Sequence, residues 1–238
     1  MRPGLDDVIA SSAMALPRNT GNAQSLIISY LTLRKLVGLL GAGLPFIMAL
    51  GGWLLFRTAI QPSISGYYYT GMRDVLVGIL CAIGVFLVSY HGYNPADFIA
   101  GKLGGLFAFG IALFPTTPDA DASPHDRLIG EAHLTCAALF FLTIACFSLF
   151  LFTKTDPDRT PTARKRQRNR IYLICGCVIL ACLALIAINL MQEGGAIIPE
   201  AVHPVFWLET AANLAFGISW IVKGEAILRD EEVKTDES

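Results

Sequence analysis

The chain has 238 residues, of which 54% are hydrophobic and only 16% are charged, and its net charge is −1. Ordinary soluble domains carry about 25% charged residues, so this composition excludes an ordinary soluble surface. The arrangement of the apolar residues decides the class of protein, because runs of about 18 or more with almost no charge are typical of membrane spans.

The N-terminal region precedes any such run. We interpret residues 1–24, which contain no sustained apolar stretch, as a flexible cytoplasmic tail rather than a secretory signal peptide. Residues 25–33 are apolar but too short to span a bilayer, so we expect them at the membrane interface.

Longer apolar runs fill most of the remaining chain. They lie at 36–56, 75–90, 98–114, 134–152, 171–190 and 205–222. Backbone groups in hydrocarbon must be paired within their own segment, so each run is predicted to be a helix. The predicted fold is therefore all-α: a polytopic membrane protein with a bundle of six transmembrane helices over residues 25–224 and a cytoplasmic tail at 225–238.

The charges of the connecting loops predict the orientation. Loop 153–170 is rich in Lys and Arg, whereas loops 115–127 and 192–204 are acidic, and short basic loops stay in the cytoplasm. Both termini are then cytoplasmic. We interpret the basic loop as a signal for orientation and for contact with anionic lipids, and predict no binding of nucleic acid.

Small residues and tryptophans predict how the helices pack. Pairs four residues apart, such as Gly78 and Ala82 or Gly101 and Gly105, mark candidate helix contact faces. Trp207 and Trp220 are expected in the two interfacial belts. The six cysteines all lie in apolar runs and are interpreted as small buried hydrophobic residues, so no disulfide, metal site or cofactor is predicted.

Candidate site residues gather where the spans meet the outer surface. Ionisable side chains at membrane depth usually face a bundle interior or a hydrated cavity. Glu209 is the deepest acidic residue, and Asn213 follows it on the same helical stripe. The candidates for binding a ligand are Ser65, Tyr69, Arg73, Asp74, Glu131, His133, His203, Glu209 and Asn213.

Structural roles remain open for several of these residues. Asp74 suits a helix N-terminus, and tyrosines are enriched where membrane meets water. Arg73 is expected to point, with Asp74, into a pocket shared with Glu131 and Glu209. The stretch 63–74, with Gly66 and Gly71 around its tyrosines, is expected to fold as a cap over the bundle mouth.

Three functions are compatible with this pattern. The first is an integral membrane protein whose outward-facing polar pocket binds a small ligand, a lipid head group or an ion. The second is a membrane-embedded lipid hydrolase, and the third is a transporter or channel formed by an oligomer. Expected partners are membrane lipids and either a second copy of the chain or another membrane protein.

Two resemblances bear on these alternatives. The stretches "SISGYYYTGMRDVLVG", "ALFP", "AALFFLTIACFSLFLFTK" and "FGISWIVKGE" resemble uncharacterised bacterial six-helix membrane proteins, which implies a bacterial inner membrane location. The general layout is similar to the superfamily of alkaline ceramidases and adiponectin-type receptors, which implies Ser63 or Ser65, Asp74, His133 and His203 around a zinc ion. The paired histidines on that family's last helix are absent here, where His203 stands alone.

Overall fold

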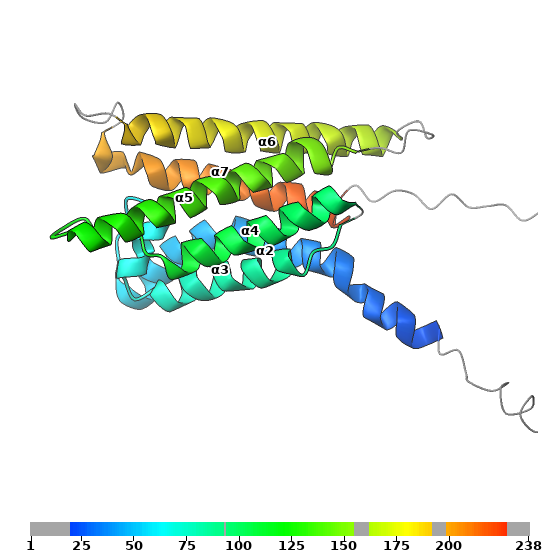
Figure 1. Ribbon diagram of the computed structural model, residues 1–238, viewed down its shortest axis with the longest axis horizontal. Coiled ribbons are helices and arrows are strands. Elements are labelled where there is room, and N and C mark those ends of the chain that lie inside the picture. The colour runs from blue at the N-terminus through cyan, green and yellow to red at the C-terminus, as the bar shows by residue number, and fades with distance from the viewer. Residues whose placement is uncertain (1–19, 93, 155–161, 192–198, 228–238) are drawn as a thin grey trace, which may run out of the picture.

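The computed structural model describes residues 20–92, 94–154, 162–191 and 199–227. The regular structure in these ranges is entirely helical, and the long helices lie side by side as a bundle (Figure 1). In chain order the elements are α2 (Thr20–Phe56), the 3-10 helix η1 (Ser65–Tyr69), α3 (Arg73–Val88), α4 (Pro95–Leu113), α5 (Pro124–Cys146), the π-helix η2 (Phe147–Leu151), α6 (Ala163–Leu190), the 3-10 helix η3 (Glu200–Val202) and α7 (Pro204–Lys223).

Helices long and apolar enough to cross a bilayer dominate the described part of the chain. There are five: Leu31–Phe56, Pro95–Leu113, Pro124–Leu151, Ala163–Leu190 and Pro204–Lys223. The remaining long helix, α3, has 16 residues and is about 24 Å long, which is less than the roughly 30 Å of a hydrocarbon core. The chain is thus a helical, multi-pass membrane protein.

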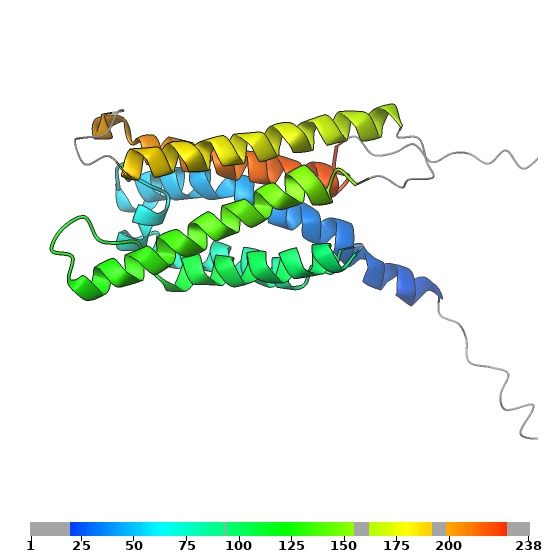
Figure 2. The same ribbon diagram turned by 45° about the horizontal axis from the view of Figure 1, so that its top comes forward.

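The helices begin earlier than the apolar runs do. α2 starts at Thr20, so residues 20–24, predicted as tail, and 25–33, predicted as a separate interfacial segment, belong to one helix with the first span. Its N-terminal turns project beyond the other helices (Figures 1 and 2). α5 starts at Pro124 because Ser123 and Asp126 form a capping box. Capping residues therefore set the start of α5, which lies ten residues before its apolar run.

Glycines bring pairs of helices into backbone contact. A β-carbon added at Gly217 of α7 would lie 2.5 Å from the carbonyl oxygen of Gly38 of α2, and one added at Gly105 of α4 would lie 2.7 Å from that of Gly84 of α3. The contact face predicted at Gly78 is wrong, since no atom lies within 4 Å of a β-carbon there. A small residue that does face α4 is Gly84, six residues further along α3, beside the ring of Phe109.

Aromatic rings fill the bundle around α7. Trp220 is fully buried, and its ring centroid lies 5.3 Å from that of Tyr90, 5.2 Å from Phe147 and 5.3 Å from Phe152. The prediction of Trp220 in an interfacial belt is therefore wrong: its ring faces neighbouring helices, whereas Trp207 is 56% exposed. Spacing along one helix does not determine the side to which a residue points.

α5 and α6 are close at one end of the bundle and apart at the other. Near η2 the side chain of Leu149 occupies the space beside Gly176 of α6. The two helices then separate toward the N-terminus of α5, as both views show (Figures 1 and 2). Side chains of α5 and α6 line a wedge-shaped groove between the separated parts.

Candidate functional site

The η1 segment is held firmly at its end of the bundle. The Gly66 N–H donates to the Ser63 hydroxyl oxygen at 2.9 Å, and the Thr70 hydroxyl donates to the Tyr67 carbonyl at 2.8 Å. Tyr67 is fully buried, and this burial raises the pKa of its hydroxyl. The segment 63–74 thus forms a folded turn that presents Ser65 at a defined position.

Ser65 is hydrogen-bonded to the most deeply placed histidine among the candidates. The His133 Nε2 atom lies 2.9 Å from the Ser65 Oγ, and its Nδ1 lies 2.6 Å from the carbonyl oxygen of Phe114. His133 is buried, and the contacts join α5 to η1 and to the end of α4. Two candidates that are far apart in the sequence therefore form a pair.

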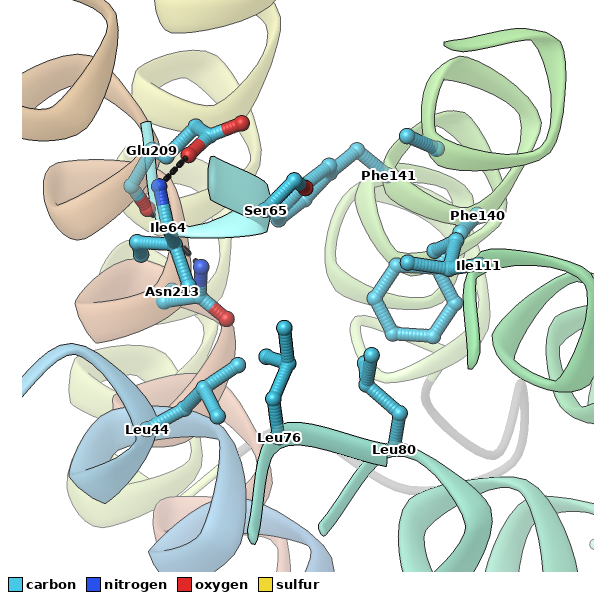
Figure 3. A pocket seen from close by; sticks show the side chains of 11 residues that line it. Leu44, Ile64, Ser65, Leu76, Leu80, Ile111, Phe140, Phe141, Glu209 and Asn213 are labelled. Carbon is cyan, nitrogen blue, oxygen red and sulfur yellow. Dashed lines mark hydrogen bonds between the residues drawn. The ribbon is translucent and has the colours of Figure 1, made fainter. Parts of the chain in front are cut away.

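Glu209 contacts the same segment from α7. Its Oε2 accepts a hydrogen bond of 2.5 Å from the Ile64 N–H, and Asn213, one turn later, donates its side-chain amide to the Glu209 carbonyl at 2.9 Å. Figure 3 shows the Glu209 carboxylate turned toward Ile64, with Ser65 beside it and Asn213 below. The Glu209 carboxylate and His133 thus contact two consecutive residues of one backbone turn, Ile64 and Ser65.

Three cavities have Ala137 and Glu209 in their walls. The end chamber has a volume of about 350 Å³ and is lined by Ser65, Glu131, His133, Leu134, Ala137 and Glu209, among others. The lateral groove, of about 520 Å³, lies in the wedge between α5 and α6 and is lined by Leu134, Ala137, Leu142, Leu180, Ala184, Leu190 and Glu209, among others. A smaller cavity of about 40 Å³ lies toward the bundle centre, with Ser65, Phe140, Glu209 and Asn213 in its wall (Figure 3).

The end chamber and the lateral groove adjoin each other and share part of their walls. Leu134, Ala137, Ile186, Leu190 and Glu209 line both of them. The groove also reaches the side of the bundle, because Leu142 and Leu190 are about half exposed there. The groove thus extends from the exposed side of α5 and α6 to the wall of the chamber that contains Ser65 and His133.

Acidic side chains line the end chamber. Glu131 and Glu209 supply carboxylates, and no Lys or Arg is among the described residues that line the chamber. His133 takes part in two short hydrogen bonds. A ligand that carries a positive charge or hydrogen-bond donors is complementary to such walls.

Comparisons of the chain with protein-family models, with curated proteins and with solved structures gave no match.

Arg73, Asp74 and Tyr69 lie apart from the chamber. Together with Tyr68 and Gly71 they line a separate surface depression. Arg73 and Asp74 therefore do not share a pocket with Glu131 and Glu209, contrary to the expectation from the sequence. The Arg73 guanidinium lies 4.5 Å from the centre of the Tyr68 ring and donates to the Tyr68 carbonyl at 3.2 Å. Arg73 is therefore engaged by its own turn.

Tyr69 joins the η1 segment to the loop after α4. Its hydroxyl donates to the Thr116 carbonyl at 2.5 Å. Partial burial, and then the negative charge of Asp126, raise the pKa of Tyr69. The neutral hydroxyl that makes this hydrogen bond is thus the form present at ordinary pH.

His203 precedes α7 and takes a left-handed backbone conformation with φ of 50°. Its Nδ1 is buried and has no hydrogen-bond partner among the described residues. Within those same residues, no three His, Cys, Asp or Glu side chains gather closely enough to hold a metal ion. The geometry of the described site is therefore one of hydrogen bonds, carboxylates and apolar walls.

Proposed function

We propose that the chain binds a single-chain membrane amphiphile whose head group is cationic or rich in hydrogen-bond donors. The hydrocarbon chain lies in the lateral groove, and the head group enters the end chamber. The observation that carries this proposal is that the two cavities adjoin each other, with Leu134, Ala137 and Glu209 in the walls of both. Ligand cavities are typically about 300–1,000 Å³, mostly apolar, with a few polar groups that fix orientation.

Glu209 is the residue expected to select the head group. It lines all three cavities and is the polar residue at the inner edge of an otherwise apolar groove. An ammonium group that reaches it forms a charge-assisted hydrogen bond in a site screened from bulk water. Glu131 is exposed and also lines the chamber, so we assign it a weaker contribution to affinity.

A photoreactive long-chain alkylamine tests this proposal in purified protein reconstituted into lipid nanodiscs. We expect saturable cross-linking to residues of the groove on α5 and α6, and competition by the unlabelled alkylamine. Glu209→Gln is expected to weaken binding about tenfold or more, because hydrogen bonds to charged groups contribute about 1.5–3 kcal/mol. Glu131→Gln is expected to weaken it less, because solvent screens exposed charges.

The matched probe is a photoreactive fatty acid with a chain of the same length. It presents a carboxylate to the two glutamates and is expected to show no saturable cross-linking in the groove. Equal labelling by the amine and the acid, or labelling spread evenly over the lipid-facing helices, would contradict the proposal.

We further propose that α3 is a sixth, short span, with both termini in the cytoplasm of a bacterium and the bundle in its inner membrane. The charges of the loops and the resemblance to bacterial six-helix proteins support this topology. So do Lys102 and Lys165, whose ammonium groups donate to the carbonyls of Val88 and Phe152 at the end opposite η1. A reporter domain inserted near Asp121 is expected to be active only outside the cytoplasm; cytoplasmic activity would refute the orientation.

A further inference from the structure

We propose that Ser65 is a nucleophile activated by His133, and that the chain transfers the fatty acyl group of an ester amphiphile to Ser65 and then to water. This inference rests on the proposed function, because the lateral groove must deliver the acyl chain. The alcohol part of the ester carries an ammonium group, which the carboxylates of the end chamber recognise.

The hydrogen bonds of His133 fix the position of its proton. The carbonyl oxygen of Phe114 can only accept, so the Nδ1 atom 2.6 Å away carries the hydrogen. In the neutral ring the Nε2 atom then has a free lone pair. Since Ser65 Oγ lies 2.9 Å from Nε2, its hydroxyl donates to that lone pair.

This arrangement is what base-assisted attack by a serine requires. A nucleophile is activated when its base is within hydrogen-bond reach and a third group holds the base in one tautomer. Here the third group is the Phe114 carbonyl. The three elements that supply the groups, η1, α5 and the end of α4, are fixed to one another by the hydrogen bonds themselves.

The reaction balances with water as the only co-reactant. The Ser65 oxygen forms a bond to the ester carbonyl carbon while its proton moves to His133 Nε2. The bond between that carbon and the alcohol oxygen breaks, and the leaving oxygen takes the proton from Nε2. Water then attacks the acyl-serine, gives one proton to Nε2 and releases the fatty acid; Nε2 returns the proton to Ser65.

Glu209 connects substrate recognition to this chemistry. Its carboxylate accepts the Ile64 N–H, the backbone donor of the residue before Ser65. When a substrate ammonium pairs with Glu209, the carboxylate is drawn toward it and the Ile64 N–H becomes available to the carbonyl oxygen. A backbone donor aimed at the developing oxyanion stabilises the transition state.

A long-chain fluorophosphonate, which reacts with activated serines, tests this role in the full-length protein in nanodiscs. We expect a single adduct on Ser65, identified by peptide mass spectrometry. Ser65→Ala is expected to abolish labelling. His133→Gln can still hydrogen-bond to both partners but accepts no proton, so the labelling rate is expected to fall about 100-fold or more. Ser89→Ala, at the opposite end of the bundle, is the control and should label at the rate of the unsubstituted protein.

Release of free fatty acid from a long-chain ester of an amino alcohol gives the second measurement. Hydrolysis that is lost in both Ser65→Ala and His133→Gln, with alkylamine cross-linking retained, supports the inference. Absence of a Ser65 adduct while the alkylamine still cross-links to the groove overturns the inference and leaves the proposed function standing. Absence of saturable cross-linking overturns the proposed function itself.

Discussion

Replacing Trp220 with alanine is expected to lower the free energy of unfolding by about 3–5 kcal/mol, the range for large-to-small substitutions of buried aromatic residues. The side chain is fully buried and lies at the centre of four other rings: Tyr90, Phe147, Phe152 and Phe216. Edge-to-face aromatic pairs contribute beyond the area that they bury. Alanine leaves a cavity that these rings cannot close without tilting away from one another.

The loss is expected to come from packing alone. The indole Nε1 has no hydrogen-bond partner among the described residues, so the substitution leaves no polar group of those residues unpaired. Trp220→Phe keeps a ring in the cluster and should destabilise less. Helical circular dichroism during titration with a denaturing detergent measures the effect. Trp207→Ala, which removes a tryptophan that is 56% exposed, is the matched control; equal losses in the two variants would show that Trp220 packs no more tightly than a lipid-facing side chain.

The helical, membrane-spanning class of the chain could be predicted because hydrophobic length is a property of consecutive residues. Each of the six apolar runs corresponds to a helix of the structure. The helix starts could not be predicted from hydropathy, since they depend on side-chain caps such as Ser123. The direction in which a single side chain points also could not be predicted, because it depends on how neighbouring helices pack. Arg34, a basic residue two positions before the first apolar run, is nevertheless 1% exposed and donates to the Tyr90 hydroxyl and the Lys223 carbonyl.

The sequence could suggest candidate residues for the site but not their geometry, and three of those suggested, Tyr69, Arg73 and Asp74, lie apart from the chamber. Glu209 and Asn213 are four residues apart, and this local spacing correctly places them on one stripe of α7. Ser65 and His133 are 68 residues apart, so no periodicity relates them. The carbonyl group of Phe114 that orients His133 belongs to the backbone. Its position therefore cannot be predicted from the identity of the side chain. Ala137, which lines all three cavities, was overlooked because a small apolar residue in an apolar run looks like any other.

Replacing Ala137 with phenylalanine is expected to abolish saturable cross-linking of the alkylamine. Ala137 lies on α5 where the end chamber, the lateral groove and the small central cavity meet. A benzyl side chain there projects into open volume, so it can be accommodated without forcing α5 from its neighbours. It closes the passage through which a hydrocarbon chain in the groove reaches Glu209 and Ser65, while both of those side chains remain in place.

The control is Leu139→Phe, which adds a ring on the same helix at a side chain that is 38% exposed and lines none of the three cavities. It is expected to bind the alkylamine as tightly as the unsubstituted protein. The labelling of Ser65 provides an internal comparison. In Ala137→Phe a short-chain fluorophosphonate should still react, because it can enter from the aqueous end of the chamber. The long-chain fluorophosphonate should not react in this variant. If the long-chain fluorophosphonate labels Ser65 equally fast in Ala137→Phe and in Leu139→Phe, then ligands reach Ser65 from the aqueous end, and the lateral groove is not their route.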